Sequence, residues 1–88
     1  MYKIEEELLN LERDRYNILN EYILGIVDIK KVRDFGRKIE VLRIHLDKIE
    51  VSEDNLYEIA SIKSKIQHFY TEIMEDEDLL RVAYSNKS

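Results

Sequence analysis

Residues 32–49 read VRDFGRKIEVLRIHLDKI and carry the pattern that decides the fold. Apolar side chains recur there every three or four residues, the spacing of the a and d positions of a heptad repeat. The six positions are Val32, Phe35, Ile39, Leu42, Leu46 and Ile49. This seam predicts a helix that packs one whole side against other helices.

The same helix has a second apolar side. Val41 and Ile44 lie off the seam, and a helix that is apolar on two sides is typical of a central position between two neighbours. We expect this helix to run from Ile29 to about Val51. Gly36 costs up to ~1 kcal/mol relative to alanine in a helix interior, which predicts either the close approach of a neighbouring backbone or a kink.

The preceding residues predict a first helix from about Tyr2 to Leu24. Two adjacent apolar rows form the broad stripe of a core-facing helix. One row holds Ile4, Leu8, Leu11, Ile18 and Tyr22, and the other holds Leu9, Tyr16, Leu19 and Ile23. The charged residues 12–15 interrupt the stripe. We interpret them as a solvated patch with local ion pairs, or alternatively as the place of a buried or interface charge at Arg15.

The link between these two helices carries clear start and stop signals. Gly25 suits the left-handed residue that ends a helix, and Asp28 suits the next N-cap. Val27 and Val32 occupy the two positions of a hydrophobic staple around that cap. The turn is therefore about four residues long, which favours antiparallel neighbours.

A similar start signal predicts the third helix. Ser52 is expected to be its N-cap, with a staple between Val51 and Leu56. The helix is expected from Glu53 to about Met74, after almost no linker. Its apolar row is Ile59, Ile62, Ile66, Phe69 and Ile73.

The C-terminal part leaves two alternatives. The acidic run at residues 75–78 favours a break, with Asp76 or a neighbour capping a short fourth helix. Alternatively the third helix continues, because Leu80 and Ala83 keep its phase. Residues 85–88 are expected to form a disordered tail.

These elements predict an all-α protein: an antiparallel up-down-up three-helix bundle with a short fourth C-terminal helix. We expect a single domain over residues 1–84, because the chain has 88 residues, no proline and only two glycines. A chain of this size buries only about 60–65% of its unfolded surface. We therefore also expect self-association, as a homodimer.

The amino-acid composition favours particular cellular compartments and types of genome. The chain contains no cysteine and has a net charge of −5, which fits a reducing compartment and excludes cysteine-ligated metal. Neither a signal peptide nor a run of ~20 apolar residues is evident, so we expect a cytoplasmic protein without a membrane span. The abundance of Ile, Lys, Glu and Asn is typical of an AT-rich genome such as that of a phage or mobile element.

No pattern of catalytic residues is present. His45 and His68 lack the spacings of metal sites in helical bundles, and the acidic run at 75–78 lacks the pattern of a calcium loop. There is no Gly-x-Ser-x-Gly element and no glycine-rich phosphate loop. We therefore expect no enzyme activity, no cofactor and no bound metal.

The sequence favours a small regulator or adaptor that binds another protein through an apolar helix face. The candidate partner-binding residues are Arg37, Val41, Ile44 and Lys48. One alternative is a nucleic-acid-binding regulator, because residues 29–51 hold seven basic and four acidic side chains. The candidate contacts are then Lys30, Lys31, Arg33, Arg37 and Lys38. Another is a structural component of a larger assembly. The basic side chains of residues 29–51 could instead pair with the acidic side chains of the two flanking helices.

Overall fold

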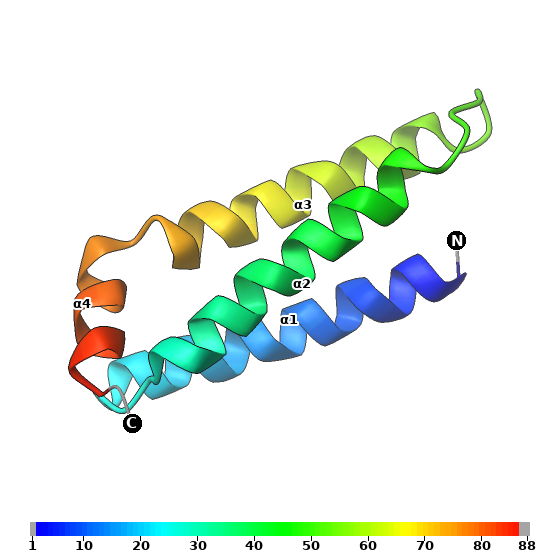
Figure 1. The fold of residues 1–88 in the computed structure, drawn as a ribbon. Helices are drawn as coiled ribbons and strands as arrows, with labels where there is room; N and C mark the ends of the chain where they lie inside the picture. Colours follow the sequence, from blue (N-terminus) through cyan, green and yellow to red (C-terminus); the bar gives the residue numbers. More distant parts are fainter. Residues whose placement is uncertain (1, 87–88) are drawn as a thin grey trace.

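The computed structural model describes residues 2–86, and the secondary structure in that range is helical throughout. Figure 1 shows three long helices side by side, with a short one folded over the end where the first helix turns into the second. The described part extends 46 × 18 × 17 Å. The helices are α1 (Tyr2–Ile23), α2 (Ile29–Asp47), α3 (Leu56–Met74) and α4 (Glu77–Ser85). The prediction of an all-helical fold is confirmed.

The seam of α2 forms the centre of the core, as predicted. The five positions from Val32 to Leu46 are each at most 1% exposed, and Ile49 is partly buried at the margin. Val27, Ile29 and two residues of α4, Leu79 and Ala83, belong to the same cluster. Its members from α1 and α3 are Ile4, Leu11, Ile18, Ile62, Ile66, Phe69 and Ile73. Full burial of one such side chain contributes about 1.5–3 kcal/mol, so this cluster is the main source of stability.

The α1–α2 turn follows its sequence signals. Gly25 has a φ of +73°, and its N–H donates to the carbonyl of Tyr22 at 2.9 Å. The N–H of Ile26 donates to the carbonyl of Glu21, also at 2.9 Å, which completes a Schellman motif. The Asp28 carboxylate then accepts from the N–H of Lys30 at 2.8 Å and caps α2. Val27 and Val32, the staple pair, are both completely buried.

The α2–α3 connection differs from the prediction. α2 ends at Asp47 and α3 begins at Leu56, so the expected tight reversal is an eight-residue linker (48–55). Asn55 takes the N-cap position in place of Ser52, but its side chain bonds within the linker instead of capping α3. It accepts from the N–H of Ser52 at 2.8 Å and donates to the carbonyl of Glu50 at 3.0 Å. The predicted cap at Ser52 is therefore wrong.

The predicted staple around that cap is absent as well. Val51 is 54% exposed and Leu56 is 50% exposed. Neither residue packs against a buried surface that would stabilise a longer helix. α2 therefore ends at Asp47 and not near Val51, and α3 begins at Leu56 and not at Glu53.

The break before α4 occurs where the acidic run suggested it. The Asp76 carboxylate accepts from the N–H of Leu79 at 3.0 Å and forms the N-cap. Leu79 and Ala83 are completely buried. α4 is thus attached to the bundle through its own small apolar side.

The predicted tail at 85–88 is described only in part. Residue 85 ends α4, and Asn86 is its C-cap. The side-chain amide of Asn86 donates to the carbonyl of Gly25 at 2.7 Å and so joins α4 to the α1–α2 turn. Residues 87 and 88 lie outside the described part.

The first predicted α1 row faces the core, whereas in the second row only Leu19 packs against it. Leu9, Tyr16 and Ile23 are 60%, 64% and 78% exposed, so the prediction that these three face the core is wrong. They follow one another at intervals of seven residues along the outside of α1, and we call them the α1 row. The physical reason is that α1 has neighbours on one side only, and a narrow stripe is enough to meet them.

Candidate functional site

The predicted partner-binding residues lie on the side of α2 that faces away from the core. Val41 is 42% exposed and Ile44 is 52% exposed, and α3 covers neither of them. Arg37 and Lys48 are exposed beside them. The structure therefore brings all four residues to one uncovered surface in the middle and at the C-terminal end of α2.

This surface continues toward the N-terminus of α2. Successive intervals of three, four, four, three and four residues place six exposed side chains along one side of the helix. We call this set the α2 row: Lys30, Arg33, Arg37, Val41, Ile44 and Lys48. It has three cations at one end, two apolar side chains after them, and one cation at the other end.

A hollow beside Val41 adds depth to the α2 row. It has a volume of about 280 Å³ and lies between α1 and α2. Leu11, which is 1% exposed, belongs to its buried lining. The remaining lining residues are Glu7, Asn10, Arg37, Lys38 and Val41. Small-molecule sites typically measure ~300–1,000 Å³. This hollow lies just below that range and has room for an inserted side chain of a partner.

Arg43 pairs with Glu40 and donates to Gln67 of α3. The other basic residues of α2 form two groups, and the first group forms pairs with α1. Lys31 bonds to Glu21 at 2.6 Å and Lys38 to Asp14 at 2.6 Å. His45 lies 2.8 Å from Glu7 in a third pair of the same kind. The three pairs are seven residues apart on both helices, which is the spacing of the charged residues that flank the seam of an antiparallel helix pair.

The second group belongs to the α2 row. Arg37 bonds to Asp34 at 3.3 Å, with side chains 74% and 61% exposed. Arg33 lies 5.9 Å from the centre of the Tyr84 ring. Lys30 and Lys48 form no ion pair with any residue of the described range. Of the five predicted nucleic-acid contacts, Lys31 and Lys38 are thus paired with α1, while the other three lie along the α2 row.

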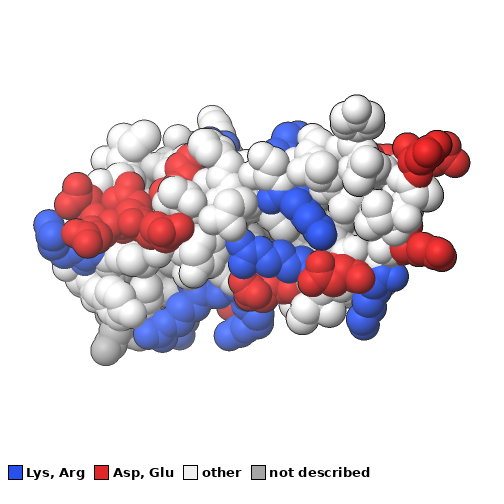
Figure 2. Space-filling model, turned by 90° about the horizontal axis from the view of Figure 1, so that it is seen from above, with Lys and Arg blue, Asp and Glu red and all other residues white. Residues whose placement is uncertain are grey.

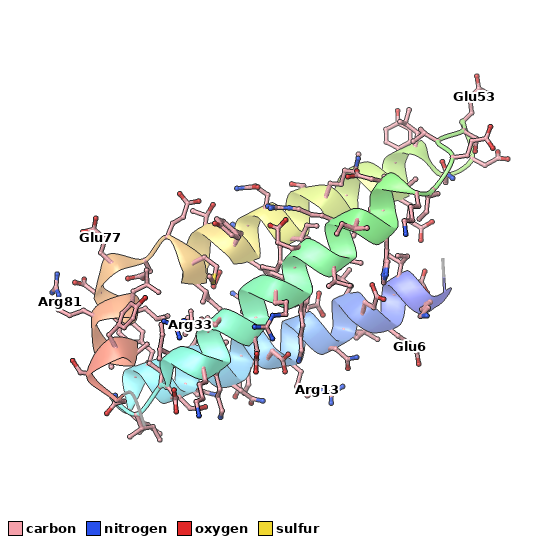
Figure 3. The ribbon with its side chains drawn as sticks, viewed as in Figure 1. Glu6, Arg13, Arg33, Glu53, Glu77 and Arg81 are labelled. Carbon is pink, nitrogen blue, oxygen red and sulfur yellow. The ribbon has the colours of Figure 1, made fainter. Side chains whose placement is uncertain are left out.

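Acidic side chains gather elsewhere on the molecule. Figure 2 shows them at both ends, with basic and acidic groups interspersed between. Glu77 lies at one end and Glu53 at the other (Figure 3). Two acidic side chains also border the α2 row, because Asp34 pairs with Arg37 and Glu7 lines the hollow beside Val41.

Each histidine lies beside a glutamate of a neighbouring turn or helix. His68 lies 3.4 Å from Glu72, but the same carboxylate accepts two hydrogen bonds at 2.9 Å from Arg15. Within residues 2–86 no three His, Cys, Asp or Glu side chains are grouped so that they could hold a metal ion.

None of the helices in the described range has both the length and the apolar character needed to cross a bilayer.

No family model, curated protein or solved structure matches this chain.

Sequence reasoning found the exposed part of α2 but missed its surroundings. Neither the hollow between α1 and α2 nor the contribution of Glu7, Asn10 and Leu11 to it was predicted. One signal was available: acidic residues at 7, 14 and 21 repeat at the same interval as basic residues at 31, 38 and 45. That match indicates which sides of the two helices meet.

Proposed function

We propose that this protein is a non-enzymatic interaction module that binds another protein through the α2 row. The observation that carries the proposal is the exposure of Val41 and Ile44 in the middle of the most deeply buried helix. Their neighbours Ile39 and Leu42 are at most 1% exposed, so α2 itself is held rigidly. A rigid helix that presents apolar side chains is the arrangement used in helix docking.

The docking mechanism follows from the shape of the surface. A partner helix lying along α2 would cover Val41 and Ile44 and place one side chain in the hollow above Leu11. Burial of this apolar surface supplies the binding free energy, at roughly 25 cal/mol per Å² before the cost of association is subtracted. The lack of cysteine fits action in the cytoplasm.

The test compares two matched double variants. V41S/I44S removes the apolar centre of the α2 row, and L24S/Y57S removes exposed apolar side chains from the α1–α2 turn and from α3, where Leu24 and Tyr57 are 71% and 87% exposed. Each variant, carrying a photo-crosslinker at residue 48, is used to capture partners from the native host. A defined crosslinked protein should form with the native chain and with L24S/Y57S but not with V41S/I44S.

Other results would reject the proposal. Equal crosslinking by both variants would place the contact elsewhere on the molecule. Crosslinking to nucleic acid alone would favour the nucleic-acid alternative, and recovery of every variant in one high-mass complex would favour a structural role.

Self-association is a separate proposal, supported by the α1 row. Leu9, Tyr16 and Ile23 repeat at intervals of seven residues, so two copies could pack antiparallel about Tyr16 with Leu9 of each against Ile23 of the other. Sedimentation equilibrium tests this arrangement. A dimer that Tyr16→Glu dissociates is expected, whereas a native chain that stays monomeric at high concentration would exclude it.

A further inference from the structure

The α2 row differs in charge from the rest of the molecule. It carries four basic side chains (Lys30, Arg33, Arg37 and Lys48) and no acidic one, although the chain as a whole has a net charge of −5. Asp34 is in contact with the row through the pair with Arg37, and Glu7 lines the hollow beside Val41, where His45 lies 2.8 Å from its carboxylate. The pair of Arg37 and Asp34 is exposed on both sides and contributes little, so Arg37 is free to turn toward a partner.

The charge excludes a second copy of the same row as its occupant. In either orientation, two α2 rows would bring cations of one copy near cations of the other, and like charges across an interface disfavour association. The occupant must instead supply carboxylates where the row has cations.

The arrangement along α2 specifies that occupant further. Three cations precede Val41 and one follows Ile44, and the hollow opens beside Val41 on the α1 side. The complementary surface has an apolar centre, several carboxylates at one end and fewer at the other. A helix with residues at three- and four-residue intervals presents such a surface on one face.

We infer that the partner segment is an acidic amphipathic helix, which docks along the α2 row with its more acidic end toward Lys30 and Arg33. This inference rests on the proposed function and adds the chemistry of the partner and its orientation.

The test uses three synthetic helical peptides with the same apolar residues. The peptides differ at four positions that flank the apolar residues, three at one end and one at the other. These four positions are all glutamate in the first peptide, all glutamine in the second and all lysine in the third. Binding to the full chain is measured by fluorescence anisotropy at ~50 and ~300 mM salt, together with binding of a 20-base-pair DNA duplex. At low salt we expect the glutamate peptide to bind about tenfold or more tightly than the glutamine peptide. The affinity of the glutamate peptide should fall as the salt concentration rises, and the lysine peptide should not bind.

Two double variants with the same change of charge give the matched control. R37E/K48E reverses two charges of the α2 row. K65E/R81E reverses two exposed charges on α3 and α4, and Arg81 has the same kind of weak local pair as Arg37, at 3.3 Å to Asp78. The preference for glutamate over glutamine should disappear or reverse in R37E/K48E and persist within about twofold in K65E/R81E.

The outcomes separate this inference from the proposed function. Equal binding of the glutamate and glutamine peptides, lost in V41S/I44S, would overturn the acidic partner and leave an apolar docking face. Failure of all three peptides to bind would also overturn the inference, while the crosslinking experiment still decides the proposed function. Binding of the duplex in place of the glutamate peptide, lost in R37E/K48E, would overturn both.

Discussion

Gly36 of α2 and Met74 at the end of α3 are packed so closely that a Cβ atom on Gly36 would lie 2.8 Å from the Cε of Met74 and 3.2 Å from its Sδ. The close neighbour that the glycine predicted is therefore a side chain and not a backbone. Because a methionine side chain is flexible, the contact is adjustable, and its energetic weight can be measured.

The first prediction concerns this contact. Gly36→Ala gains up to ~1 kcal/mol of helix propensity, but in the native chain part of that gain is lost because the end of Met74 must move. In a Met74→Ala background the space is open, and the full gain should appear. Urea denaturation of the four chains of this cycle measures the difference. An equal effect of Gly36→Ala in both backgrounds would show that the two residues do not interact.

The second prediction concerns the pair between Arg15 and Glu72, which joins α1 to α3. Arg15 donates from Nε to Oε1 and from Nη2 to Oε2, both at 2.9 Å, and the side chains are only 32% and 25% exposed. We expect a coupling free energy of about 1 kcal/mol, which decreases in 1 M salt. A double-mutant cycle with Arg15→Ala and Glu72→Ala measures it.

The matched control for that cycle is the pair of Arg81 and Asp78. It lies at the surface of α4 with side chains 74% and 72% exposed, and its coupling should be within about 0.5 kcal/mol of zero. If both pairs gave the same coupling free energy, the interhelical geometry of the Arg15–Glu72 pair would add nothing to the stability of the fold.

The third prediction separates the buried and exposed sides of α1. Ile18 is 2% exposed and Ile23 is 78% exposed. Ile18→Ala should lower the free energy of unfolding by about 2–4 kcal/mol, because it leaves a cavity in the core. Ile23→Ala should change it by less than about 0.5 kcal/mol. Thermal and urea unfolding test the pair, and a large loss from Ile23→Ala would indicate that another copy covers the α1 row.

The fourth prediction concerns the helix caps. Asp28→Ala and Asp76→Ala each remove a side chain that caps a helix and should cost about 0.5–2 kcal/mol. Ser52→Ala should cost less than about 0.5 kcal/mol, because the interaction of Ser52 with Asn55 uses its backbone N–H. Chemical denaturation compares the three variants. A cost for Ser52→Ala equal to that for Asp28→Ala would restore Ser52 as the N-cap of α3.

The sequence predictions are accurate where the interacting residues are close together along the chain, and they fail where the outcome depends on residues far apart in the sequence. The Schellman turn at Gly25 and the cap at Asp28 agree with the structure because their partners lie within a few residues along the chain. The predicted cap at Ser52 fails although its local pattern is equally good. There the buried surface ends at Leu46, and the pattern alone does not contain that information.

The candidate site shows the same division. The apolar positions Val41 and Ile44 were found from the sequence because they lie off the seam of α2. That α3 leaves them uncovered depends on where α3 packs. The use of Lys31 and Lys38 in pairs with α1 likewise depends on the register between two helices.

The sequence by itself determined the helical character of the chain, the seam from Val32 to Leu46 and the caps around the first turn. These features arise from the period of 3.6 residues and from bonds between near neighbours. Only the tertiary structure decided which row of α1 is buried and which side of α2 remains open. The physical reason is that apolar residues on either side of a helix are equivalent in sequence, and burial distinguishes them only once the neighbouring helices are in place.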